Sequence, residues 1–136
     1  EYIKIMKQHN LICFIELKGD FSDEEIESMF GFVREEYDIS KCIMQSFEFD
    51  NLLKAKEVVP DLPLMLTYGV GDGDYEKCFE YGISIDTDYN ALTQKMVDDF
   101  HSRGLLVAAW TANTRFALNY CRAMGVDLIE SDYFMK

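Results

Sequence analysis

Two charged side chains close an apolar stretch near the start of the sequence. Residues 11–15 are apolar, and Glu16 and Lys18 follow them two positions apart. Residues two apart in a β-strand point to the same face, so the carboxylate and the ammonium are expected to lie side by side. At the carboxyl end of a parallel strand, such groups can bind a metal ion and an anion. A strand that simply runs out into solvent is the alternative, and these residues alone do not decide between the two.

Polar or aromatic side chains recur at the ends of the later strands that the sequence predicts. They are Gln45 and Ser46, Thr67 and Tyr68, Asp86, Trp110 and Thr111, and Ser131 and Asp132. Polar residues at the ends of several strands are typical of a (β/α) barrel enzyme, because its active site is built at the carboxyl ends of the strands. Alternation places Gln45 and Ser46 on opposite faces of their strand. Either could bind a phosphate or satisfy backbone groups, and we expect the second role for Gln45.

The elements that position these residues alternate between strand and helix. Apolar strands are expected within residues 11–18, 42–47, 62–68, 83–86, 105–111 and 126–132. Capping residues and helical spacing predict helices over residues 22–37, 51–58, 75–79, 93–100 and 114–124, after an opening helix without a cap. Strands that are apolar on both faces and joined by helices form parallel sheets. The fold class is therefore α/β, with about six parallel strands alternating with helices.

Two architectures fit this alternation. An open doubly wound sheet is the usual solution for 136 residues, but no strand is followed by the glycine-rich dinucleotide motif. The polar rim favours part of a (β/α)8 barrel instead. A complete barrel needs about 250 residues, so this one would be partial. The uncapped opening helix also suggests that the chain is a fragment.

The acidic composition argues against two classes of partner. Asp and Glu outnumber Lys and Arg by 25 to 13, and the net charge of −12 disfavours nucleic acid and anionic membranes. No segment reaches the roughly 18 apolar residues of a membrane span. The widely spaced Cys13, Cys42, Cys78 and Cys121 are expected to be buried free thiols rather than disulfides or zinc ligands. Free thiols favour a reducing compartment, so we expect a cytoplasmic location.

Several motifs, in this order, resemble the glycerophosphodiester phosphodiesterase family. They are Ile15-Glu16-Leu17-Lys18, Gln45-Ser46-Phe47, His101-Ser102-Arg103-Gly104-Leu105, Trp110-Thr111-Ala112-Asn113, and the final Gly125-Val126-Asp127-Leu128-Ile129-Glu130-Ser131-Asp132. Each motif is weak alone, but their order and spacing are specific. The resemblance covers essentially the whole chain and implies strands three to eight of a TIM (β/α)8 barrel, with the first two strands absent. Residues 1–136 would form a single incomplete barrel domain, the C-terminal part of such an enzyme.

The resemblance also implies a reaction and a site. The family hydrolyses glycerophosphodiesters to glycerol 3-phosphate and an alcohol with a divalent cation, usually Ca²⁺ or Mg²⁺. By resemblance Glu16 is a metal ligand and Lys18 is the catalytic charge beside the phosphate oxygens. Phe47 and Trp110 would bind the small-molecule substrate, although either could instead fill the core.

Departures from the family pattern limit the expected activity. The family's first-strand His-Arg-Gly, second-strand Glu-x-Asp and following His-Asp have no counterpart here. His101 imitates the first of these motifs, but it lies at a predicted helix C-terminus, where a cation and a capping glycine are favourable, so we expect a structural role. His9 is expected on the surface, between helix and strand. With one carboxylate, this chain alone is expected neither to hold the ion nor to turn over substrate.

Two further functions stay open at this stage. One is a noncatalytic binding or assembly module derived from the barrel. The other is a related phosphodiesterase of lipid metabolism that cleaves phospholipids. In either case the free edges of an incomplete barrel can pair with another strand, so a homo-oligomer is expected.

Overall fold

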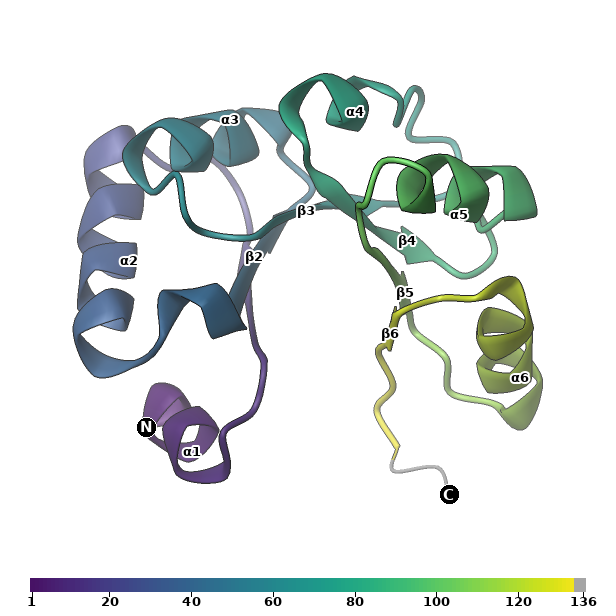
Figure 1. Cartoon of the computed structure of the whole chain (residues 1–136), viewed down its shortest axis with the longest axis horizontal. Helices are drawn as coiled ribbons and strands as arrows, with labels where there is room; N and C mark the ends of the chain where they lie inside the picture. The colour runs from purple at the N-terminus through teal and green to yellow at the C-terminus, as the bar shows by residue number, and fades with distance from the viewer. Residues whose placement is uncertain (134–136) are drawn as a thin grey trace. The chain divides into compact units, whose positions relative to one another are not determined.

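A computed structural model describes residues 1–133, and Figure 1 shows its elements. The strands are β1 (Cys13–Leu17), β2 (Cys42–Ser46), β3 (Leu64–Tyr68), β4 (Ser84–Asp88), β5 (Val107–Trp110) and β6 (Leu128–Ile129). They follow one another in the sheet in the order in which they occur in the chain. The pairs β1–β2, β4–β5 and β5–β6 are parallel. The predicted α/β fold is confirmed.

Helices separate each strand from the next. They are α1 (Tyr2–His9), α2 (Asp23–Glu36), α3 (Phe49–Val58), α4 (Lys77–Tyr81), α5 (Gln94–His101) and α6 (Arg115–Met124), with a short 3₁₀-helix η1 (Ile39–Lys41). Every predicted helix is present. Sequence reasoning missed η1, because three residues are too few to show a helical period. Asp38 caps it by accepting a hydrogen bond from the Ser40 amide at 3.0 Å.

Side-chain caps explain where three of the helices begin. The Ser22 hydroxyl accepts a hydrogen bond from the Glu25 amide at 3.2 Å, and the Ser22 amide donates to the Glu25 carboxylate at 2.8 Å. This reciprocal pair is the predicted capping box of α2. Thr93 and Thr114 cap α5 and α6 with a single bond each, in which the threonine hydroxyl accepts from the amide of Met96 or Ala117.

The chain forms two compact units, Glu1–Met65 and Leu66–Lys136. In the first, β1 pairs with β2 so that Glu16 lies opposite Gln45 and Leu17 opposite Ser46. Helices α2 and α3 pack against each other, and α3 also contacts β2. The core of this unit includes the fully buried side chains of Ile26, Phe30, Met44 and Leu52.

The second unit is built around β4, β5 and β6. Met96, Val97 and Phe100 of α5 are buried, and the Phe100 ring packs against Phe79 with 4.9 Å between ring centroids. Small buried residues form a second cluster beneath α6: Ala109, Ala112, Ala117 and Cys121. Through these small side chains, α6 contributes Ala117 and Cys121 to a cluster that also contains Ala109 of β5.

The cysteines are free and buried, as predicted. Burial raises the pKa of the Cys42 and Cys78 thiols to about 12, so both stay protonated near neutral pH. Within residues 1–133, no helix has the length and apolar character needed to cross a membrane.

Candidate functional site

The carboxyl end of β1 carries the predicted charge pair. Lys18 Nζ lies 3.3 Å from Glu16 Oε2, which confirms that the two side chains share a face. The Lys18 side chain is 77% exposed, whereas that of Glu16 is 26% exposed. The carboxylate is therefore held near the sheet, and the ammonium can move to meet an anion from solvent.

Gln45 lies on the same face as this pair. It is the register partner of Glu16, and directly paired residues of parallel strands point to the same side of the sheet. Gln45 is only 6% exposed, yet within residues 1–133 its Oε1 has no hydrogen-bond partner. The expectation that Gln45 satisfies backbone groups is therefore wrong for this oxygen. The physical reason is that the neighbouring backbone groups already pair with each other in the parallel ladder.

Ser46 lies on the opposite face, where a hydrogen-bond network holds the loop after β1. Its hydroxyl donates to the Leu17 carbonyl at 2.8 Å and accepts from Asn51 Nδ2 at 3.2 Å. Asn51 also donates to the Gly19 carbonyl at 2.7 Å and accepts from the Phe21 amide at 3.1 Å. Ser46 and Asn51 thus position the chain that immediately follows Lys18. This network gives Ser46 a structural role.

Sequence reasoning missed Asn51. The residue is fully buried in the first turn of α3, although asparagine is a weak helix former. A polar residue five positions after the strand-end serine was the available signal. This signal could not be interpreted without knowing that the loop after β1 lies within hydrogen-bonding distance of the Asn51 side chain.

The two predicted substrate-binding aromatic residues differ in exposure. Phe47 follows β2 and is 47% exposed, so the alternative that it fills the core is wrong. Trp110 ends β5 in the second unit and is half-buried. Its indole Nε1 donates to the Asp86 carbonyl at 3.2 Å, which fixes the ring against β4.

Other polar residues at strand ends bind one another. Asn113 Nδ2 donates to the Asp132 carboxylate at 2.6 Å, and Asn113 Oδ1 accepts from the Asp132 amide at 2.9 Å. Asp132 therefore orients the side chain of Asn113. Ser131 donates to the same Asn113 oxygen at 3.2 Å. This cluster links the ends of β5 and β6.

The two histidines lie at helix ends. His101 is the last residue of α5, and its Nε2 is 2.9 Å from Asp127 Oδ2, which also accepts from the Val107 amide at 2.8 Å. The predicted structural role is confirmed, because this contact fastens α5 to the start of β5. His9 is exposed but belongs to α1 rather than to the connection after it, because the helix continues to the left-handed cap at Asn10.

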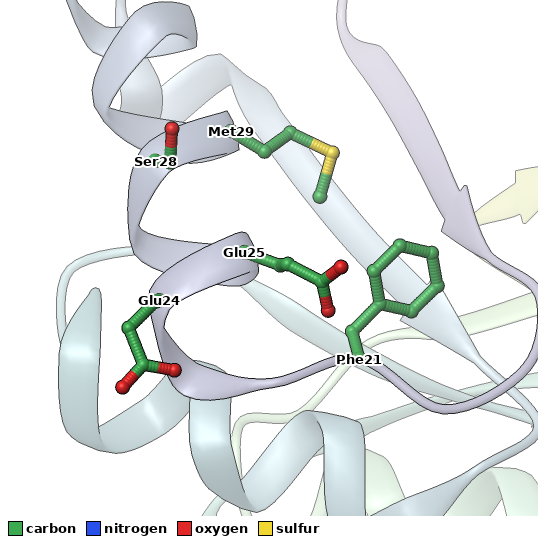
Figure 2. Close-up of a pocket in the computed structure, with 5 residues that line it drawn as sticks. All are labelled: Phe21, Glu24, Glu25, Ser28 and Met29. Carbon is green, nitrogen blue, oxygen red and sulfur yellow. The ribbon is translucent and has the colours of Figure 1, made fainter.

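A pocket of about 480 Å³ lies beside the first turns of α2. Its lining consists of Phe21, Glu24, Glu25, Ser28 and Met29. Figure 2 shows the Phe21 ring and the Met29 side chain extending toward the same space, while Glu24 points away. The Glu25 carboxylate is engaged in the capping box. The pocket contains none of the predicted site residues, so we do not assign it to the candidate site.

The described residues do not by themselves fit a divalent metal centre. Across residues 1–133, no three His, Cys, Asp or Glu side chains come together where they could hold an ion. Glu16 supplies one carboxylate, and that carboxylate pairs with Lys18. A site for Ca²⁺ or Mg²⁺ needs several oxygen ligands.

Comparison with known proteins gives consistent matches. A model of the "Glycerophosphoryl diester phosphodiesterase family" matches residues 3–136. YhdW of Bacillus subtilis (strain 168) is 30% identical over 125 residues, which are 88% of this chain and 51% of YhdW. The chain therefore spans about half the length of this curated relative.

Solved structures show the same fold. A phosphodiesterase of Oleispira antarctica, in complex with the product sn-glycerol-3-phosphate, matches with a TM-score of 0.82 and 19% identity over 96% of this chain and 55% of that one. A glycerophosphodiester phosphodiesterase of Parabacteroides distasonis matches with a TM-score of 0.81 and 21% identity over 96% and 58%. The predicted partial TIM (β/α)8 barrel, with parallel strands alternating with helices, is confirmed.

Proposed function

The chain belongs to the glycerophosphoryl diester phosphodiesterase family, and we propose on that basis that it is part of a hydrolase that converts glycerophosphodiesters to glycerol 3-phosphate and an alcohol. The observation that carries this proposal is the Glu16–Lys18 pair at the carboxyl end of β1, with 3.3 Å between Nζ and Oε2. It supplies a carboxylate and a mobile cation at the end of the barrel where enzymes of this architecture bind substrates.

Lys18 is the residue that we assign to the phosphate. A phosphodiester carries a negative charge on its non-bridging oxygens, and this charge repels an incoming nucleophile. An exposed ammonium can approach these oxygens and stabilise the charge as it redistributes during attack. Glu16 keeps the ammonium near the strand end until an anion arrives. Product binding in the Oleispira antarctica relative agrees with a phosphate ester as the ligand.

Glu16 has a second proposed role as one ligand of Ca²⁺ or Mg²⁺. Such an ion would supply charge neutralisation at the phosphate when bound. Because residues 1–133 do not bring together the other ligands, we propose that residues outside this set complete the site. We accordingly expect the chain alone to be inactive or nearly so.

Phe47 and Trp110 are the proposed substrate-binding aromatic residues. The exposed face of Phe47 suits the carbon chain of the glycerol moiety, since it follows the strand that pairs with β1. Trp110 is held rigidly by its hydrogen bond to Asp86, and a ring fixed in this way can contact substrate at little cost in side-chain entropy.

A noncatalytic binding or assembly module is the second candidate. It is favoured by the absence, among the described residues, of three converging metal-ligating side chains. Such a module would keep the Lys18 phosphate site and bind a phosphate ester without cleaving it.

The test measures ligand binding and turnover separately. Binding of glycerol 3-phosphate is followed by NMR titration of the wild-type chain, of Lys18→Met and of Lys56→Met, a control that removes an exposed lysine of α3. We expect Lys18→Met to weaken binding by about tenfold or more, as for loss of a charge-assisted hydrogen bond, and Lys56→Met to have little effect. Equal affinities of the two variants would refute the assignment of Lys18.

Turnover is measured as release of glycerol 3-phosphate from glycerophosphocholine with Ca²⁺ or Mg²⁺. Little or no release by the chain alone is expected. Robust turnover would show that residues 1–136 hold a complete site and would overturn the expectation of inactivity.

A further inference from the structure

Gln45 carries an amide oxygen whose burial the fold does not explain. The residue is 6% exposed, and in the part of the chain that the structure describes its Oε1 accepts no hydrogen bond. Burying an acceptor without a donor is unfavourable, and an apolar side chain would fill the same position without that penalty. A residue that reduces stability in this way is typical of a binding site.

The position of Gln45 relates this oxygen to the charge pair. Gln45 is directly opposite Glu16 in the β1–β2 register, and Lys18 and Glu16 share a face through their 3.3 Å contact. Phe47 comes directly after β2 and is 47% exposed. The face that holds Glu16 and Gln45 thus presents a cation, a carboxylate and a neutral acceptor.

We propose that Gln45 is a ligand-binding residue of this site, whose Oε1 accepts a hydrogen bond from a hydroxyl group of a polyol phosphate. This inference rests on the proposed function, because it takes Lys18 as the phosphate-binding group. Inorganic phosphate would also use Lys18, but it lacks the carbon-borne hydroxyl groups that extend from a phosphate ester toward an acceptor beside Glu16. A hydroxyl group on the ester's carbon chain is a donor, and it satisfies the oxygen that the fold leaves without a partner.

Ser46 provides the contrast that separates a structural role from a binding role. Its hydroxyl donates to Leu17 and accepts from Asn51 and from the Glu48 amide, so its hydrogen-bonding capacity is used within the fold. Removing that hydroxyl should destabilise the protein and leave ligand preference unchanged. Replacing the Gln45 amide with an apolar group should not lower the stability of the protein, but it should reduce the preference for glycerol 3-phosphate.

The experiment compares wild type, Gln45→Leu and Ser46→Ala. For each protein, NMR titrations measure the dissociation constants of sn-glycerol 3-phosphate and inorganic phosphate, and thermal unfolding gives the midpoint temperature.

Wild type is expected to prefer glycerol 3-phosphate. In Gln45→Leu this preference should fall by about tenfold, as for loss of one buried hydrogen bond, while phosphate affinity stays within about twofold and the midpoint does not fall. Ser46→Ala should lower the midpoint and keep the preference.

Different failures have different meanings. If wild type prefers glycerol 3-phosphate and Gln45→Leu keeps that preference, the role of Gln45 is wrong and the proposed function stands. A lower midpoint for Gln45→Leu with unchanged preference would likewise show a purely structural residue. If wild type binds neither ligand, the assignment of Lys18 as the phosphate-binding group of this chain fails, and this inference fails with it.

Discussion

Two neighbouring residues of β2 serve the two faces of the sheet in different ways. Ser46 faces α3 and joins Asn51 in bonds that hold the loop after Lys18. Gln45 faces the Glu16–Lys18 pair and keeps a buried acceptor without a partner among residues 1–133. One strand end therefore supports the loop from one side and offers hydrogen-bonding capacity on the other. This division follows directly from the two-residue period of a strand.

Asn51 is predicted to stabilise the fold through the loop. Asn51→Ala removes the bonds to the Gly19 carbonyl, the Phe21 amide and the Ser46 hydroxyl. Because these groups lose their buried partner, we expect the free energy of unfolding to fall by about 2 kcal/mol. Urea denaturation measures the change. The control is Asn119→Ala on the exposed face of α6, which should change stability by no more than about 0.5 kcal/mol.

Loss of the Asn51 network should also affect the candidate site. The loop after β1 begins directly beyond Lys18, so a mobile loop would weaken glycerol 3-phosphate binding in Asn51→Ala even though the asparagine lies on the other face. Stability equal to that of Asn119→Ala would contradict the importance of this network.

Helices and strands differ in how well local sequence defines their ends. Ser22, Thr93 and Thr114 mark helix starts because each caps with its own side chain. Strand ends are set by pairing with a neighbour, which the local sequence does not contain. The sequence predicts a strand within residues 126–132, but β6 covers only Leu128–Ile129, and from Ser131 the chain enters the polar cluster around Asn113.

Two glycines are predicted to respond in opposite directions to the same substitution. Gly31 lies inside α2, where an added Cβ meets no atom within 4 Å, so Gly31→Ala should stabilise the protein by up to about 1 kcal/mol through higher helix propensity. Gly125 ends α6 with φ of 85°, a left-handed conformation that side chains disfavour. Gly125→Ala should therefore cost about 1 kcal/mol. Urea denaturation of both variants checks the signs, and a stabilised Gly125→Ala would show that the cap does not require glycine.

For the whole molecule, the order and spacing of motifs along the chain predicted the family and the partial barrel fold. The motifs around Glu16, Phe47 and Trp110 identified the family and the strand ends, because several short motifs in a fixed order are specific even where each one alone is weak. Gln45 was assigned to the backbone and Asn51 was missed, because their roles depend on which groups face them across β1 and the following loop. Such relations arise only when the strands pair.

Self-association is the prediction that belongs to the whole chain. The strand order leaves β1 at one edge of the sheet, and large apolar side chains are exposed beside it: Tyr2, Ile5, Leu11 and Ile12. A free strand edge next to exposed apolar surface favours pairing with another strand. We therefore expect sedimentation velocity to show an oligomer whose fraction rises with protein concentration.

Charge placed at this edge should disrupt the oligomer. Ile12 is 53% exposed, so Ile12→Lys changes the surface at little cost to the core, and a lysine beside an edge strand opposes pairing. Phe116→Lys is the matched control, because Phe116 is 75% exposed on α6 in the other unit. If β1 mediates association, Ile12→Lys sediments as a monomer where Phe116→Lys and wild type do not. Identical behaviour of the two variants would place the contact elsewhere, and a monomeric wild type at high concentration would mean that this edge does not pair in solution.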